Sequence, residues 1–226
     1  MTTVIIDDYN YRDLLPEDII KASRLRVRVK DFRRIDMSIL ERNLNIRSLN
    51  VSRLENLDLH FIEFHASIAR IIYANPRLHS VHLGYVTGEI IVALGKLTNL
   101  RKLSVGMVGS LGEELSVLVQ KSRTLKHFAV SHVLMHTQTL YHAIALNQSI
   151  THLTLPRFGD LLRVILKHNV YITHVTIREG NCNSQKIQDL IARYPHIKFK
   201  SRSLSTLKVE EEYGLEDCMK CKHVII

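Results

Sequence analysis

The segment Ile150-Thr-His-Leu-Thr-Leu155 recurs 22 residues later in the similar form Ile172-Thr-His-Val-Thr-Ile177. Each copy alternates apolar and polar positions, a pattern that is typical of a half-buried strand. Between the copies, Leu161-Leu162 and Ile165-Leu166 have the spacing of one face of a short helix. A strand and a helix that recur with a period in the twenties indicate a stacked repeat, because one such unit is too small to bury its own apolar face.

The same apolar-x-x-apolar-x-apolar core recurs along most of the chain. Its first positions are 24, 22, 25, 25, 22 and 25 residues apart, and this regular spacing predicts six full strands and a shortened seventh. The seven cores are Leu54/Leu57/Leu59, Leu78/Val81/Leu83, Leu100/Leu103/Val105, Leu125/Phe128/Val130, Ile150/Leu153/Leu155, Ile172/Val175/Ile177 and Ile197/Phe199.

These cores resemble the L-x-x-L-x-L pattern of leucine-rich-repeat proteins over roughly residues 46–200. The resemblance implies an α/β solenoid with a curved parallel sheet on its concave side and short helices on its convex side, similar to the ribonuclease-inhibitor-like subclass. The chain departs from the family where an asparagine or cysteine usually follows, three residues after the last leucine. We therefore expect no asparagine ladder inside the turns, since these positions hold Ile62, Val86, Val108, Val133, Phe158 and Gly180.

The two ends of the chain lack this regular spacing. We predict an N-terminal cap over residues 1–52, the repeat array over 53–200 and a C-terminal cap or tail over 201–226. Within the first cap, Leu14–Ile20 is expected to form a short helix with Pro16 in its first turn. The alternating patterns of residues 24–30 and 46–51 predict two strands, and residues 36–44 predict a second helix.

Composition favours an intracellular protein, cytoplasmic or nuclear. The chain has 226 residues and is 46% hydrophobic, which is enough for a sizeable core. It has no apolar run near the roughly 18 residues of a membrane helix, and its start does not have the pattern of a secretion signal. Three cysteines leave one unpaired in any disulfide scheme, which favours a reducing compartment. We expect no membrane association.

The net charge of +9 is concentrated in one region. Residues 121–200 contain 11 Lys and Arg against 3 Asp and Glu, together with eight of the 13 histidines. A basic field of this kind attracts acidic partners and affects association more than folding.

The third position of each core is expected to face the concave side, where neighbouring strands lie about 4.8 Å apart. This position reads Asn56, Ser80, Lys102, His127, His152 and His174. The histidines are open to three interpretations: a recognition surface, solvated residues tolerated in strands, or a metal site without the carboxylates that usually orient such ligands. We favour recognition of a protein partner with an acidic surface, with contacts from Lys102, Lys126, His127, His152, His174 and Arg178.

Two alternatives use other parts of the sequence. The cations from Arg24 to Lys30 could contact phosphates, but cations on a terminal strand also prevent edge-to-edge aggregation. The first alternative function is a basic structural subunit of a ribonucleoprotein or other large assembly, with the basic half of the chain, residues 121–200, against nucleic acid. The second is a substrate receptor of a ubiquitin ligase, because Leu14–Ile20 resembles the start of an F-box.

No catalytic or cofactor motif is present in the sequence. It contains no phosphate-binding glycine loop, no zinc-protease helix motif and no nucleophile elbow. Cys218, Cys221 and His223 have the spacing of zinc ligands, but one C-x-x-C pair is weak support and two cap thiols are the simpler interpretation. We expect a protein that is not an enzyme and that holds no cofactor or metal.

Overall fold

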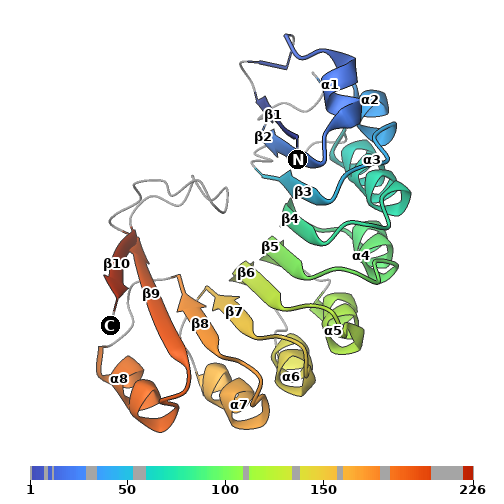
Figure 1. Cartoon of the computed structure of the whole chain (residues 1–226). Coiled ribbons are helices and arrows are strands. Elements are labelled where there is room, and N and C mark those ends of the chain that lie inside the picture. Colours follow the sequence, from blue (N-terminus) through green and yellow to red (C-terminus); the bar gives the residue numbers. More distant parts are fainter. Residues whose placement is uncertain are drawn as a thin grey trace. The chain divides into compact units, whose positions relative to one another are not determined.

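The computed structural model describes residues 2–7, 10–11, 13–28, 35–52, 60–108, 112–133, 138–156, 160–178, 184–204 and 221–225. Strands and helices alternate throughout these residues. The hydrogen-bonded order of the strands follows the chain from β1 to β10 (Figure 1). The chain divides into two compact units, Met1–Gly106 and Met107–Ile226. The predicted repeating α/β architecture with a parallel sheet is confirmed.

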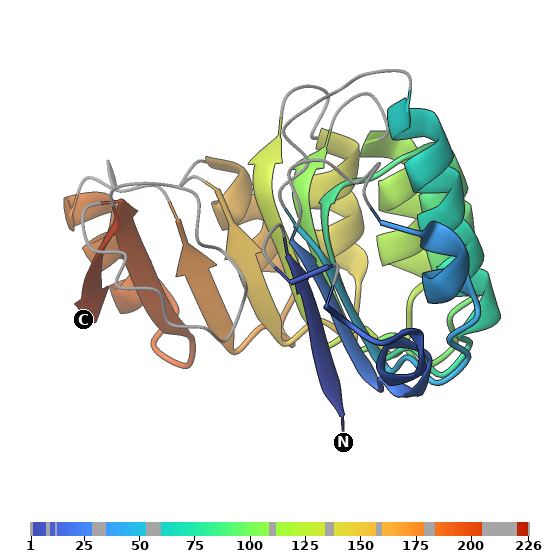
Figure 2. The ribbon, with the colours of Figure 1, turned by 90° about the horizontal axis from the view of Figure 1, so that it is seen from above.

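In the first unit, β1 to β4 pair in parallel with their neighbours, and helices connect them. Helices α3 and α4 cover one face of these strands (Figure 2). The strands are β1 (Thr3–Asp7), β2 (Arg24–Arg28), β3 (Ser48–Val51), β4 (Ser80–Tyr85) and β5 (Lys102–Val108). The helices are α1 (Pro16–Lys21), α2 (Met37–Glu41), α3 (His60–Ala74) and α4 (Gly88–Gly95).

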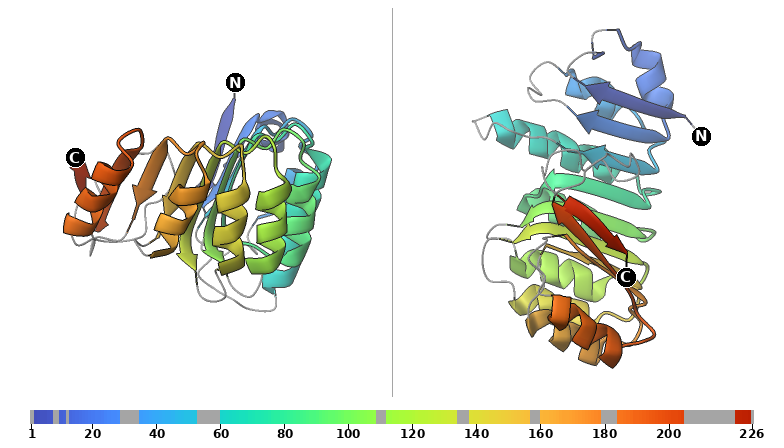
Figure 3. Two further views of the ribbon diagram at one scale, coloured as in Figure 1. Left: turned by 90° about the horizontal axis from the view of Figure 1, so that it is seen from below. Right: turned by 90° about the vertical axis from the view of Figure 1, so that its left-hand side faces the viewer.

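In the second unit, β6 to β9 are parallel and β10 pairs antiparallel with β9. Helices α5 to α8 lie along one side of these strands (Figure 3). The strands are β6 (His127–Val133), β7 (His152–Leu155), β8 (His174–Ile177), β9 (Lys198–Leu204) and β10 (Cys221–Ile225). The helices are α5 (Gly112–Lys121), α6 (Gln138–Leu146), α7 (Asp160–His168) and α8 (Ser184–Arg193).

Alternation along each strand separates a buried face from an open face. In β7 and β8, Leu153 pairs with Val175 and both are almost fully buried, whereas the flanking histidines are partly exposed. β4 repeats the pattern with Val81 and Leu83. The first, fourth and sixth positions of the predicted cores therefore form the interior against the helices. The third positions of the described strands face away from it, as predicted.

Four asparagines lie buried at the turn between a helix and the next strand. Asn43, Asn75, Asn147 and Asn169 are each at most 2% exposed. The Nδ2 group of Asn147 donates to the carbonyl oxygens of Val119 (2.6 Å) and Ser122 (2.8 Å). Val119 belongs to α5, and Ser122 directly follows that helix. Its Oδ1 accepts from the backbone N–H groups of Ser149 and Ile150. One side chain thus satisfies four backbone groups.

Asn43 and Asn169 repeat the donor contacts of Asn147, and Asn75 makes a different set. Asn169 donates to the carbonyls of Ile144 and Asn147, and Asn43 donates to those of Ile19 and Ala22. Asn75 donates to the carbonyl of Asn43 and accepts from the N–H of Ile46. The expectation of no asparagine ladder was wrong, because asparagines precede Ile46, Leu78, Ile150 and Ile172 by three residues instead of following the cores. The signal in the sequence is N-x-x-apolar, as in Asn147 before Ile150.

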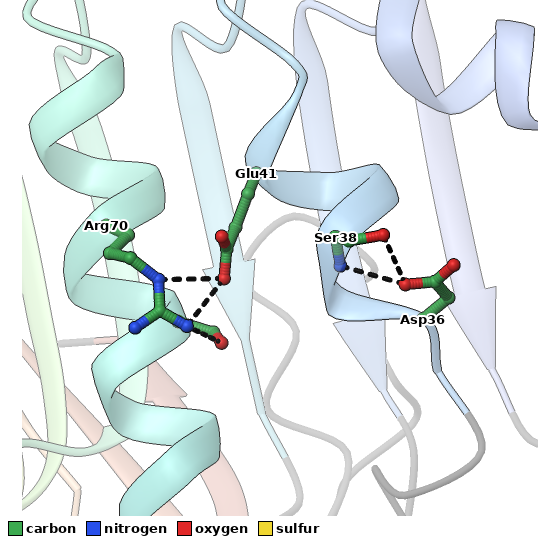
Figure 4. Close-up of polar contacts among 5 residues, drawn as sticks. Asp36, Ser38, Glu41 and Arg70 are labelled. Atoms are coloured by element: carbon green, nitrogen blue, oxygen red, sulfur yellow. Dashed lines mark hydrogen bonds and ion pairs between the residues drawn. The ribbon is translucent and has the colours of Figure 1, made fainter.

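A polar joint connects α2 and α3 on the helical side of the first unit (Figure 4). Arg70 donates to Glu41 Oε1 from Nε (3.0 Å) and from Nη2 (2.8 Å), and Nη2 also donates to Ser67 Oγ. The Arg70 guanidinium holds the pKa of Glu41 below its usual value. Asp36 caps α2 by accepting from the backbone N–H and the hydroxyl of Ser38.

The N-terminal region differs from its prediction in three respects. Thr3–Asp7 forms a strand that was not predicted from the sequence, and it lies at the edge of the sheet. β2 therefore has a partner on each side, so the interpretation of its cations as protection of a terminal strand was wrong. The neighbour of β4 is β3 and not the predicted strand at Leu54–Leu59. Residues 53–59, including Asn56, lie outside the described residues, so the domain boundary at 52/53 stays a prediction. α1 begins at Pro16 as expected.

We predict that Asn147→Ala lowers the free energy of unfolding by about 2–3 kcal/mol, because it leaves buried backbone donors and acceptors without partners. Urea unfolding followed by circular dichroism measures the loss. Asn99→Ala is the matched control, since Asn99 is exposed, and its effect should stay within about 0.5 kcal/mol. Equal effects of the two substitutions would contradict the structural role of Asn147.

Candidate functional site

Three histidines form a stacked column on the open face of the second unit. His127, His152 and His174 are the first residues of β6, β7 and β8, and the strand register pairs each with the next. The ring centroids of His127 and His152 are 4.1 Å apart, and those of His152 and His174 are 4.2 Å apart. The same row ends at Lys198 in β9, which pairs with His174. The predicted histidine ladder is thus present; we call these three residues the histidine column.

A threonine directly before the histidine orients two of the rings. Thr173 Oγ1 donates to the carbonyl of Thr151 (3.2 Å) and lies 2.9 Å from His174 Nδ1. Thr151 Oγ1 makes the same pair of contacts to the Lys126 carbonyl (3.3 Å) and to His152 Nδ1 (2.9 Å). A hydroxyl has one proton, so both contacts are hydrogen bonds only when the ring Nδ1 carries a proton and donates it.

This arrangement explains the different tilts in the column. The rings of His152 and His174, which both follow a threonine, are within 5° of parallel. His127 follows Lys126, and its ring is tilted by 30° from that of His152. The neutral tautomer with a proton on Nδ1 leaves Nε2 as the acceptor. In the described part of the chain, Nε2 of His174 has no hydrogen-bond partner, so it is available to a group from outside.

Cations flank the histidine column at its C-terminal end. Lys198 and Lys200 are exposed on β9, in register with His174 and Thr176. Burial lowers the pKa of His174, and the positive charges of Lys198 and Lys200 lower it further. His174 is therefore neutral near pH 7 and gains a proton only below its ordinary value of 6.5. Two protonated rings about 4 Å apart would repel each other.

The structure brings some of the other predicted contact residues to the same face. Arg178 follows β8 and its Nη1 donates to Ser131 Oγ of β6. Lys126 immediately precedes β6 and is exposed, and its carbonyl accepts the N–H groups of Thr151 and His152. Lys102 begins β5 and belongs to the first unit. The predicted contacts are therefore divided between the two units.

No metal centre is found in the described residues, since no group of three or more His, Cys, Asp or Glu side chains has suitable geometry. Cys182 and Cys218 lie outside the described residues. Cys221 lies in β10, for which only the backbone is described. The C-x-x-C pair as a zinc site therefore has no structural test.

A hollow of about 700 Å³ lies between α2 and α3 in the first unit. Its lining includes Glu41, Arg70 and Ser67, which are already hydrogen-bonded to one another. Glu63 and the buried ring of Phe64 complete the apolar and acidic parts of the wall. We interpret this hollow as part of the packing surface between α2 and α3, since Glu41, Arg70 and Ser67 in its wall are hydrogen-bonded to one another.

The fold and the histidine column define a repeating α/β solenoid with a polar open face. The chain matches no known protein-family model, and no curated protein resembles it significantly in sequence. None of the helices in the described residues has both the length and the apolar character needed to cross a membrane.

We predict that the protein loses stability as the pH falls from about 7 to 5.5. His79 and His174 both have pKa values below 6.5, so below that pH the unfolded chain binds more protons than the folded one. Thermal unfolding at half-unit pH intervals measures the decline. In the double variant His79→Gln/His174→Gln the decline should be shallower, whereas in His142→Gln/His168→Gln, which changes two helical histidines, it should match wild type. A decline of equal steepness in both variants would contradict the assignment.

Proposed function

We propose that this protein is a non-catalytic binding scaffold of the leucine-rich-repeat type, which recognises an acidic protein surface. The contact surface in the second unit is the open face around the histidine column, Lys126, Arg178 and Lys198. The observation that carries the proposal is the column itself, because three imidazoles held in register by a sheet form a regular row of hydrogen-bonding groups.

The rigidity of the column supports recognition over simple tolerance of polar residues. A solvated face has no need to orient its side chains, whereas the threonine hydroxyls hold His152 and His174 in nearly parallel planes. Fixed side chains lose little conformational entropy when a partner binds, which increases affinity for a given set of contacts. The repeated Thr-His pair in adjacent strands is the local sequence that produces this order.

The electrostatics of the site favour an acidic partner. Lys126, Arg178, Lys198 and Lys200 supply permanent positive charge. A carboxylate placed against the column stabilises the protonated imidazole and so raises the pKa that burial and the two lysines lower. Binding of the partner therefore takes up protons, and affinity increases as the pH falls.

The alternative of a ubiquitin-ligase receptor has no specific support in the arrangement of its segment. Leu14–Ile20 contributes to α1, a helix of six residues that connects the parallel strands β1 and β2. Lys102, one of the predicted contacts, lies in a different basic region of the first unit. We therefore restrict the proposed surface to the second unit.

We predict that fluorescein-labelled poly-L-glutamate binds the full chain about 10-fold more tightly at pH 5.5 than at pH 7.5, as protons enter the histidine column. Fluorescence anisotropy at constant ionic strength measures this. The variant His152→Gln/His174→Gln should lose most of the pH dependence while it keeps the pH 7.5 affinity within about 3-fold.

The control is His142→Gln/His168→Gln, which removes two exposed histidines from helices of the same unit. This variant should show the full wild-type pH dependence. The proposal fails if wild-type affinity is independent of pH, or if the control variant loses the dependence as completely as the column variant.

A further inference from the structure

We propose that the first unit contains a second and separate interaction site, which binds the phosphate backbone of a nucleic acid. The site consists of Arg24, Arg47, Arg101 and Lys102 around His79, and we call it the arginine cluster. It shares no residue with the surface proposed in the second unit, so either proposal can fail without the other.

The backbone places these residues together at the ends of neighbouring parallel strands. His79 N donates to the carbonyl of Arg47 (3.0 Å), and the carbonyl of His79 accepts from Arg101 N (2.8 Å) and Lys102 N (2.9 Å). Arg47, His79 and Arg101 thus occupy equivalent positions immediately before or at β3, β4 and β5. Arg24 begins β2 and is in register with Ser48, the residue after Arg47.

The four cations are exposed, and the described residues form no ion pair with them. Within the described ranges, none of the four side chains forms a side-chain hydrogen bond. No carboxylate of the described residues pairs with these four positive charges, which repel one another, and a ligand that supplies negative charge relieves this repulsion.

The lowered pKa of His79 reflects the four positive charges near it. Burial lowers the pKa of His79, and the charges of Arg101, Arg47, Lys102 and Arg24 lower it further. All four cations are therefore close enough to act on one partly buried ring. The ring is neutral at pH 7, because its pKa lies below the ordinary value of 6.5.

The residues between the cations favour phosphate over an acidic protein surface. Arg24, Ser48 and Ser80 are in register on β2, β3 and β4, so two small hydroxyls follow Arg24 in one row. Arginine forks and serine hydroxyls are common donors to phosphate oxygens. Protein interfaces rely on buried aromatic or aliphatic anchors, whereas contacts to a phosphate backbone need only distributed cations. The arginine cluster has such cations and contains no aromatic or aliphatic anchor.

The expected binding is insensitive to sequence and sensitive to salt. Four neutralised phosphates on a single strand give a slope of about −3 in a plot of log affinity against log salt concentration. With no aromatic side chain in the cluster, base stacking contributes nothing to affinity, so a homopolymer and a mixed sequence should bind alike.

The test is fluorescence anisotropy of the full chain with labelled single-stranded oligothymidylate at pH 7.5 over a series of salt concentrations. The variant Arg24→Gln/Arg47→Gln/Arg101→Gln/Lys102→Gln should lose on the order of 100-fold in affinity at low salt, with a slope near zero. Circular dichroism confirms its fold, and because the four side chains are exposed the variant should unfold at the wild-type temperature.

The matched control removes four cations from helices of the second unit, Lys121→Gln/Arg163→Gln/Lys167→Gln/Arg193→Gln, and thus produces the same change in net charge. It should keep the wild-type slope and bind within about 3-fold of wild type. Equal losses in both variants would show that net charge alone drives binding and would overturn the site. Absence of oligonucleotide binding by the wild type at low salt would overturn it as well.

A local readout comes from NMR titration of His79. Bound phosphates offset the surrounding cations, so saturating oligothymidylate should raise the pKa of His79 and leave His142 unchanged. An unchanged pKa of His79 in the saturated complex would place the nucleic acid elsewhere. Poly-L-glutamate bound at the histidine column should not produce this shift.

Discussion

The turn between each helix and the following strand is the point on which the structure depends. A helix ends there with unpaired carbonyls and a strand begins with unpaired N–H groups, and both are buried by the next unit. Asn43, Asn75, Asn147 and Asn169 solve this problem with one amide each, which donates to backbone carbonyls and accepts from backbone N–H groups at these turns. The hydrophobic core then forms between strands whose spacing and register these bonds help to fix.

Much of the fold could be predicted from the apolar pattern, because alternation within strands and a regular spacing between them both follow from burial on one face. The pattern predicted every described strand from Ser80 to Phe199 and the direction of its side chains. It failed near the N-terminus, where Thr3–Asp7 is too short for a periodic signal and α3 has 15 residues, which lengthens one unit. The asparagines were not predicted because they stand three residues before the strand core, whereas the leucine-rich-repeat pattern places them after it.

The candidate site was predictable in its position and not in its detail. Register follows from the core, so the row His127, His152 and His174 could be predicted from its common third position. The ring orientations could not, since they depend on hydrogen bonds from Thr151 and Thr173 to carbonyls of neighbouring strands. The arginine cluster was also not predicted. Arg24, Arg47 and Arg101 are far apart in the sequence and become neighbours only because β2 to β5 lie side by side in the sheet.

The asparagine bonds also have a direction along the chain. The amide of Asn147 donates to carbonyls at 119 and 122, and that of Asn169 donates to carbonyls at 144 and 147, so each of these asparagines binds its repeat to the preceding one. On a ribosome the acceptors are made before their donor. A newly synthesised repeat can therefore pack onto a repeat that has already folded. When the repeats fold in chain order, the carbonyl acceptors of each buried asparagine amide are already present.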